Sequence, residues 1–201
     1  MNKTLPNILI LLTLALLTTC GTRRTTPTAD PLTTDPGVTI NGITWATRNV
    51  DAPGTFAANP EDAGMLFQWG RKKGWDIINI DKEVEEEWGY SRATSTAWYP
   101  ENDPCPEGWR VPTEAELISL AEADSKWTIQ NDVNGRLFGT ALSQLFLPGV
   151  TWQDDGVGGL YWSNTQHNER WAVRLGFYSE GVNVNETFRE YGFSVRCVKI
   201  K

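Results

Sequence analysis

The sequence predicts an α+β fold: a single domain with short strands, one clear helix and much loop. The chain has 201 residues, of which 40% are hydrophobic and 21% charged, so it can pack a core and is not globally disordered. One segment carries a helix-capping sequence, and several short apolar runs that are not contiguous are typical of strands. No linker or repeat of fixed period divides residues 38–201, so we expect one domain there.

Residues 1–19 predict a lipoprotein signal peptide. Lys3 supplies a positive charge, and the mostly apolar run at residues 8–17 is too short to span a bilayer. It ends in a sequence that resembles a bacterial lipobox, Leu17-Thr18-Thr19-Cys20-Gly21, which implies cleavage before Cys20 and lipidation of its sulfur. The other interpretation is an ordinary cleaved signal with an incidental cysteine. We expect a lipid-anchored protein of the cell envelope, at the outer membrane.

Residues 20–37 predict an extended tether that begins at the lipidated cysteine. The stretch 21–37 holds six Thr and three Pro without apolar periodicity, a composition that cannot bury a core. Arg23 and Arg24 lie where many surface-exported lipoproteins of Bacteroidetes carry acidic residues. The sequence therefore leaves open which side of the outer membrane the domain occupies.

The two remaining cysteines, Cys105 and Cys197, predict a disulfide, because thiols outside the cytoplasm usually pair. The alternative is a nucleophilic Cys105 served by His167. His167 is the one histidine of the chain, which excludes a multi-histidine metal site.

The first half of the domain predicts a hairpin over residues 38–50 and a strand within the apolar run at 64–70. Residues 71–103, with an acidic run at 83–87, favour surface loop and short helix. The clearest helix begins after Thr113, since Glu116 completes a capping box and the apolar residues 117, 120 and 121 share one face. We expect this helix to end near residues 123–124.

The second half predicts a short helix over residues 137–145, followed by strands and turns. The segment 193–198 predicts a final strand tied to Cys105 by the disulfide. Among the 10 tryptophans, we expect residues 45, 69, 109 and 162 in the core. Residues 75, 88 and 98 form either a stacking platform for sugar rings or a partly buried set.

The net charge of −7, without a basic block, argues against nucleic acid as a partner. Asp154 and Asp155 precede a glycine-rich turn and fit either a calcium site or a solvated turn. We expect no metal and no cofactor.

Residues 164–191 predict a recognition surface on physical grounds alone. Val173, Leu175 and Phe177 alternate with residues 174, 176 and 178, which places one set in the core and the other in solvent. Aromatic and arginine side chains concentrated in a short span are typical of binding interfaces. The other interpretation is an ordinary polar loop and edge strand.

Several segments in this order together resemble the Fibrobacter succinogenes major paralogous domain, common in Bacteroidetes lipoproteins: residues 43–50, 105–117, 147–149, 161–163 and 192–198. The resemblance covers roughly residues 40–200 and implies the C-type-lectin-like fold of formylglycine-generating enzymes. The copper-binding cysteine pair of those enzymes is not carried over, because Cys105 and Cys197 suit a structural bridge. The Glu-Pro-Asn and Trp-Asn-Asp calcium triplets of sugar-binding C-type lectins are absent.

Residues 161–198 also resemble the variable segment of diversity-generating retroelement target proteins. Ala172, Leu175, Phe177, Ser179 and Val182 lie at positions of the fixed skeleton. The resemblance implies that the variable, ligand-binding positions are Gln166, His167, Asn168, Glu169, Arg170, Trp171, Arg174, Tyr178, Glu180, Asn183, Asn185, Glu186, Phe188, Arg189 and Glu190.

The sequence therefore predicts a lipid-anchored envelope protein that binds a protein or glycan ligand non-covalently through its C-terminal face, without enzymatic activity. The first alternative is a structural envelope lipoprotein without ligand specificity. A weaker alternative is an enzyme related to the formylglycine-generating fold.

Overall fold

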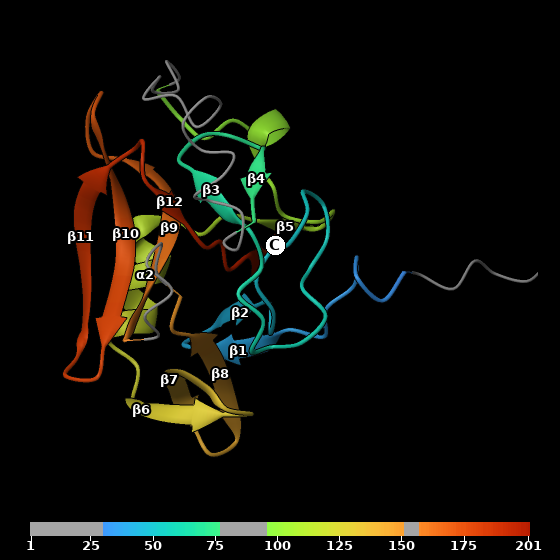
Figure 1. Cartoon of the computed structure of the whole chain (residues 1–201), viewed down its shortest axis with the longest axis vertical. Coiled ribbons are helices and arrows are strands. Elements are labelled where there is room, and N and C mark those ends of the chain that lie inside the picture. The colour runs from blue at the N-terminus through green and yellow to red at the C-terminus, as the bar shows by residue number, and fades with distance from the viewer. Residues whose placement is uncertain (1–29, 77–95, 151–156) are drawn as a thin grey trace, which may run out of the picture.

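The computed structural model describes residues 30–76, 96–150 and 157–201 (Figure 1). Of these residues, 44% are in strands and 7% are helical, so the fold is mostly β. The predicted α+β, C-type-lectin-like class is therefore wrong. The helical content is too small for an α+β fold. The one α-helix of the described chain, α2 (Glu114–Ala121), has 8 residues, whereas the strands form four small antiparallel sheets.

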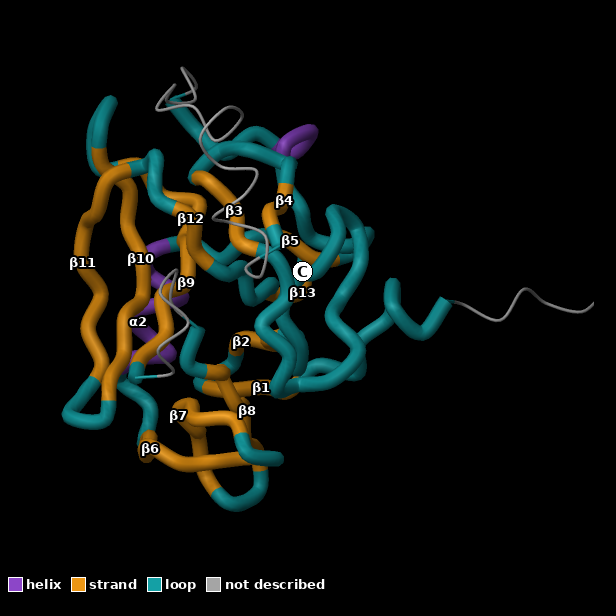
Figure 2. The backbone as a smooth tube through the Cα atoms, in the orientation of Figure 1, coloured by secondary structure: helices purple, strands orange, loops and turns teal. Residues whose placement is uncertain are grey.

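Two of the four sheets combine strands that lie far apart in the sequence, and the other two consist of consecutive strands (Figure 2). The first has the order β1 (Val38–Ile40), β2 (Ile43–Trp45), β13 (Val198–Lys199), β5 (Trp109–Arg110), and the second β12 (Gly192–Phe193), β3 (Leu66–Gln68), β4 (Gly74–Trp75). The third has the order β6 (Ser125–Gln130), β7 (Val133–Thr140), β8 (Ser143–Pro148), and the fourth β11 (Val182–Phe188), β10 (Trp171–Tyr178), β9 (Gly158–Gln166). A short 3₁₀ helix, η2, spans Pro100–Asn102.

The predicted hairpin and first strand are confirmed as β1–β2 and β3. Asn41 and Gly42 join β1 to β2 with φ angles of 49° and 77°, the left-handed pair that a two-residue hairpin turn requires. The predicted final strand is split into β12 and β13. Between them, the carbonyls of Val195 and Cys197 accept hydrogen bonds from the backbone amides of Val50 and Ala46.

The predicted helix is confirmed with its capping box. The Thr113 hydroxyl accepts from the Glu116 amide, and the Glu116 carboxylate accepts from the Thr113 amide. Arg110 donates to both oxygens of the same carboxylate at 2.8 and 2.7 Å. The helix ends at Ala121, slightly before the expected residues 123–124.

The predicted helix over residues 137–145 is wrong, because this segment forms β7, a turn and β8. The apolar side chains of Leu137, Phe138 and Leu145 fit a helical spacing, but sheet pairing places Leu145 opposite Phe138. A Cβ on Gly135 would lie 2.4 Å from the Phe146 ring, so close strand packing explains this glycine.

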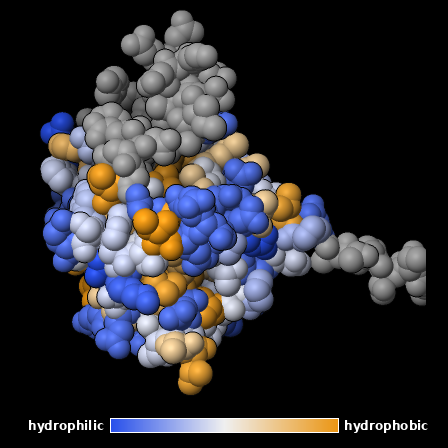
Figure 3. Space-filling model, turned by 60° about the horizontal axis from the view of Figure 1, so that its bottom comes forward, coloured by the Kyte–Doolittle hydropathy of each residue, from blue (hydrophilic) through white to orange (hydrophobic). Residues whose placement is uncertain are grey.

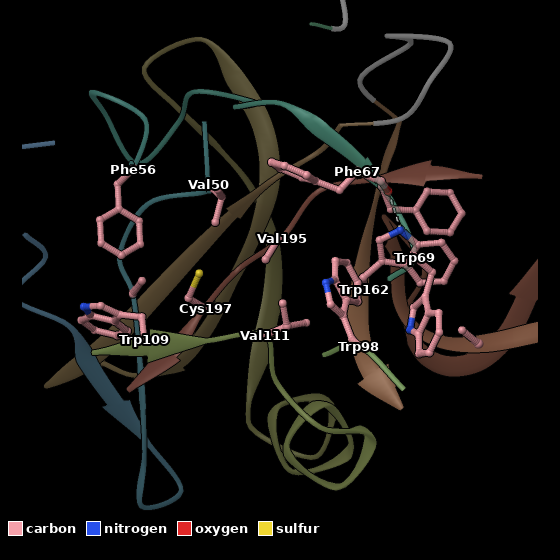
Figure 4. Packing of buried hydrophobic residues seen from close by; sticks show 13 residues of the cluster. Val50, Phe56, Phe67, Trp69, Trp98, Trp109, Val111, Trp162, Val195 and Cys197 are labelled. Carbon is pink, nitrogen blue, oxygen red and sulfur yellow. Dashed lines mark hydrogen bonds between the residues drawn. The ribbon is translucent and has the colours of Figure 1, made fainter. Parts of the chain in front are cut away.

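The core consists of two clusters on either side of β9, which alternates Tyr161 into one and Trp162 into the other. Figure 4 shows the Trp162 cluster, to which Val195 and Cys197 also belong. Cys197 is bonded to Cys105 across a sequence separation of 92 residues. The disulfide prediction is confirmed, and the alternative of a nucleophilic Cys105 thiol is wrong.

The tryptophans at 45, 69, 109 and 162 are buried, as predicted. Trp75 and Trp98 are also buried, at 6% and 7% exposure, so the sugar-stacking platform proposed for them is wrong. Trp88, the acidic run at 83–87, Asp154, Asp155 and the lipidation site Cys20 lie outside the described residues.

The described end of the predicted tether lies against the domain. Asp35 is buried and pairs with Arg48 at 3.1 Å, while Arg48 also donates to the carbonyls of Pro31 and Thr34. This N-terminal segment and the β9–β10–β11 sheet lie on opposite sides of the molecule (Figure 1). The domain therefore holds the start of its described chain far from that sheet.

Candidate functional site

The predicted ligand-binding residues belong to β9, β10, β11 and their turns, the sheet at one side of the molecule (Figure 1). Nine are exposed: His167, Asn168, Glu169, Arg170, Tyr178, Glu180, Asn183, Asn185 and Glu186. Five are partly buried: Gln166, Trp171, Arg174, Phe188 and Glu190. The remaining one, Arg189, is buried at 3% exposure.

Four of the five residues that the sequence assigned to the fixed skeleton pack into the core beneath this sheet, and the fifth does not. Ala172, Leu175 and Phe177 are each 0% exposed, and Val182 packs against the Tyr161 cluster. Ser179, in contrast, is exposed in the turn between β10 and β11. The exposed side chains therefore project from strands whose alternate residues are fixed in the core.

The register of β10 with β11 separates the predicted residues into two groups on opposite faces of the sheet. Arg174 pairs with Asn185 and Gly176 with Asn183, whereas Trp171 pairs with Phe188 and Val173 with Glu186. Directly opposed residues share a face and neighbours along a strand alternate. We call the surface of Arg174, Tyr178, Asn183 and Asn185 the arginine face, and that of His167, Asn168, Trp171, Glu186 and Phe188 the tryptophan face.

On the arginine face, the Arg174 guanidinium lies across Gly176. It donates to the Asn183 side-chain oxygen at 2.6 Å, and a Cβ on Gly176 would come within 2.0 Å of Arg174 Nη1. Asn185 donates to the same Asn183 oxygen at 3.3 Å. Burial lowers the pKa of Arg174, and the nearby Tyr178 opposes that shift.

On the tryptophan face, a turn closed by its own hydrogen bonds presents residues 167–170. Asn168 Oδ1 accepts from the amides of Arg170 and Trp171 at 2.9 and 3.1 Å, and the Trp171 carbonyl accepts from the amides of His167 and Asn168. This arrangement fixes Trp171 at the start of β10.

A shallow surface pocket of about 300 Å³ opens beside this turn, lined by His167, Asn168, Trp171 and Glu186. His167 Nδ1 lies 3.4 Å from Glu186 Oε1, and both side chains are about half exposed. Trp171 packs against Phe188 with ring centroids 4.3 Å apart. The pocket thus combines the indole of Trp171 with side chains that can donate hydrogen bonds and side chains that can accept them.

The Arg189 side chain is buried and holds the 167–170 turn in place, so it does not belong to the exposed surface. Its guanidinium lies 4.1 Å from the centre of the Trp69 ring and donates to the Glu169 carbonyl at 3.2 Å. Its backbone amide donates to the Arg170 carbonyl. Arg189 therefore ties the 167–170 turn to the Trp162 cluster.

Two residues of this surface are absent from the predicted ligand-binding set. Tyr191, 48% exposed, lies at the end of the predicted recognition segment 164–191 and packs edge-on against Phe188 at 5.8 Å. Arg136 on β7 donates to the Tyr178 carbonyl at 3.0 Å, a contact across sheets without a local sequence signal. Other large apolar side chains on the surface are scattered among polar ones (Figure 3).

Within the described ranges, no three His, Cys, Asp or Glu residues gather in an arrangement suited to a metal ion. The part of the chain that the structure describes also contains no helix long and apolar enough to cross a membrane. No protein-family model, curated protein or solved structure matches this chain.

Proposed function

We propose that this chain is a cell-envelope lipoprotein that binds a protein or glycan ligand non-covalently through the β9–β10–β11 sheet and its turns. The observation that carries the proposal is the mixture of exposed aromatic, arginine, asparagine and acidic side chains on strands backed by Ala172, Leu175 and Phe177. Such a rigid backing allows surface side chains to differ without loss of the core.

The position of the N-terminal segment supports the same proposal. Arg48 holds residues 31–35 on the side of the molecule away from β11 (Figure 1). A lipid at Cys20 would then attach the protein by the side opposite the proposed binding sheet. That attachment leaves the exposed side chains of the sheet accessible to a ligand: the arginine face, and the end of the tryptophan face beyond the buried Leu175 and Phe177.

The protein-level test compares the full-length lipoprotein with a variant in which His167, Tyr178, Asn185 and Glu186, four exposed side chains, are all replaced by Ala. Both are applied to an array of bacterial and host glycans and to an array of purified extracellular proteins. The proposal expects binding that the variant loses, with an unfolding free energy within about 2 kcal/mol of the parent, since single surface sites usually change it by less than 0.5 kcal/mol. Absence of binding on both arrays, or binding equal in the variant, contradicts it.

The gene locus tests the variable character of this sheet. If residues 161–198 belong to a retroelement target, a near-copy of their codons lies beside a reverse-transcriptase gene and differs mainly where the copy has adenine. The differing codons should then encode residues of the arginine and tryptophan faces. A locus without such a copy removes the hypervariable part of the proposal and leaves a fixed-sequence binding protein.

A further inference from the structure

We infer that the ligand is a saccharide and that one of its rings docks in the pocket of the tryptophan face lined by His167, Asn168, Trp171 and Glu186. This inference rests on the proposed function and names the class of ligand. The pocket has a volume of about 300 Å³, at the lower end of the range of small-molecule sites. This size suits one sugar ring rather than a peptide segment.

Some polar atoms at the rim of the pocket already have a partner within the protein, and others can still form hydrogen bonds with a ligand. Asn168 Oδ1 is occupied by the amides of Arg170 and Trp171, which fixes the side chain, whereas its Nδ2 donor has no hydrogen bond to another described residue. Glu186 contacts His167 through Oε1, so the carboxylate keeps Oε2 as an acceptor. A sugar hydroxyl both donates and accepts, and neighbouring hydroxyls match a rim that alternates donor and acceptor.

The apolar part of the pocket is held rigidly. Trp171 packs against Phe188 at 4.3 Å with an interplanar angle of 34°, and Phe188 in turn meets Tyr191 edge-on at 5.8 Å. An indole fixed by such contacts loses little side-chain entropy when a ligand covers it. The C–H face of a sugar ring provides the matching flat apolar surface.

The charge of the pocket disfavours an anionic ligand. Glu186 brings a carboxylate to the rim, 3.4 Å from the imidazole of His167, and the other lining side chains, Asn168 and Trp171, carry no charge. A protein anchor residue needs a well-packed pocket that water leaves completely, whereas the side chains of His167 and Glu186 are 51% and 47% exposed. A shallow, polar site with one aromatic wall fits a polyol better than a peptide side chain.

The experiment uses the full-length, acylated protein in detergent on an array of neutral and acidic oligosaccharides, followed by calorimetric titration of the strongest neutral binder. We compare Trp171→Ala and Glu186→Gln with the matched controls Tyr99→Ala and Glu107→Gln, which change exposed side chains outside the β9–β10–β11 sheet. Tyr178→Ala and Asn185→Ala are measured beside them to detect a competing site on the arginine face. The expected result is an affinity loss of about tenfold or more for the first pair, as for the removal of a central anchor, and less than about twofold for the matched controls. Trp171→Phe keeps an aromatic wall and should recover part of the affinity, and thermal unfolding of each variant separates lost binding from lost folding.

The outcomes separate this inference from the proposed function. Binding only to proteins, with loss in the four-residue variant, overturns the saccharide inference and retains a binding sheet. Saccharide binding that depends on Tyr178 or Asn185 but not on Trp171 overturns the assignment to this pocket. Binding to neither class overturns both proposals.

Discussion

Gly64 adopts a left-handed φ of 65°, and a Cβ built on it would lie 2.1 Å from the carbonyl oxygen of Val50. Gly54 is also left-handed, with a φ of 86°, but a Cβ there would meet no atom within 4 Å. We predict that Gly54→Ala lowers the unfolding free energy by about 1 kcal/mol, the cost of the left-handed conformation alone. Gly64→Ala should cost about 3 kcal/mol or more, because the backbone must also move.

Urea unfolding of both variants with the disulfide intact measures this difference. Equal losses in the two variants would mean that the strand after Gly64 relaxes freely, in contradiction to its packing beside Val50.

At the same scale, the sequence predicts the buried residues of the candidate site better than its exposed ones. The alternation of Leu175 and Phe177 with polar neighbours identifies the core side of β10, because burial follows a period of two in a strand. It does not reveal which residues of β11 share a face with Arg174 and which with Trp171, since this depends on the register with β11. Nor does it show that Arg189 is buried, because its partner Trp69 is remote in sequence.

The helix α2 carries a prediction about pH. Burial alone would raise the pKa of Glu116, but hydrogen bonds from Arg110 and Thr113 and the charge of Arg110 lower it below its ordinary value of 4.5. A carboxyl group with a lowered folded-state pKa stabilises fully above its unfolded pKa and loses this contribution as the pH falls through the folded-state pKa. Glu116→Gln should therefore cost about 1–2 kcal/mol at pH 7 through the lost charge-assisted pair with Arg110, since a glutamine can still accept from the Thr113 amide in the capping box.

The difference in unfolding free energy between parent and Glu116→Gln should shrink as the pH falls below 4.5. Glu114→Gln is the matched control, because it removes a charge from the same first turn without touching Arg110; it should cost less than about 0.5 kcal/mol. A pH-independent difference for Glu116→Gln would contradict the role of the charged form.

Among the elements, local signals predicted α2 and the β1–β2 hairpin, and failed for β6–β7–β8. Thr113, Glu116 and the pair Asn41-Gly42 act through neighbours only a few residues away, so their effect is visible in the sequence. The turn between β6 and β7 instead uses Asn131 and Asp132, at φ angles of 47° and 65°, without a glycine. The α+β prediction included a second helix over residues 137–145, which instead form the end of β7, a turn and the start of β8.

For the whole molecule, the disulfide between Cys105 and Cys197 joins the segment before β5 to the residue before β13, and these two strands pair in the first sheet. Its separation of 92 residues corresponds to an entropic stabilisation of roughly 4–5 kcal/mol at most. We predict a loss close to this value for the double variant Cys105→Ser, Cys197→Ser, measured by urea unfolding. A loss below about 1 kcal/mol would show that the unfolded chain is already compact around this pair.

The opposite placement of the N-terminal segment and the β9–β10–β11 sheet predicts how the anchored protein is oriented. After disulfide formation and lipidation of Cys20, the proposed mature chain has no free thiol, so a single introduced cysteine reports its own surroundings. Glu180→Cys places a thiol in the exposed turn between β10 and β11, and Thr33→Cys places one in the exposed N-terminal segment. In proteoliposomes, a thiol reagent carrying a polymer of about 5 kDa should modify position 180 as fast as in detergent, because that turn points away from the anchor.

Position 33 should react several-fold more slowly in proteoliposomes than in detergent. Arg48 fixes residues 31–35 on one side of the domain, and the lipid anchor holds that side next to the bilayer. Adding Arg48→Ala releases this segment, so the difference in modification rate at position 33 between proteoliposomes and detergent should diminish. The same change leaves Asp35 buried without its cation, so the unfolding free energy should fall as well. Equal slowing at both positions would mean that the domain lies flat on the bilayer and hides the sheet. That geometry is incompatible with presentation of either face to a ligand, whereas selective slowing at position 33 is what a binding domain displayed from its far side requires.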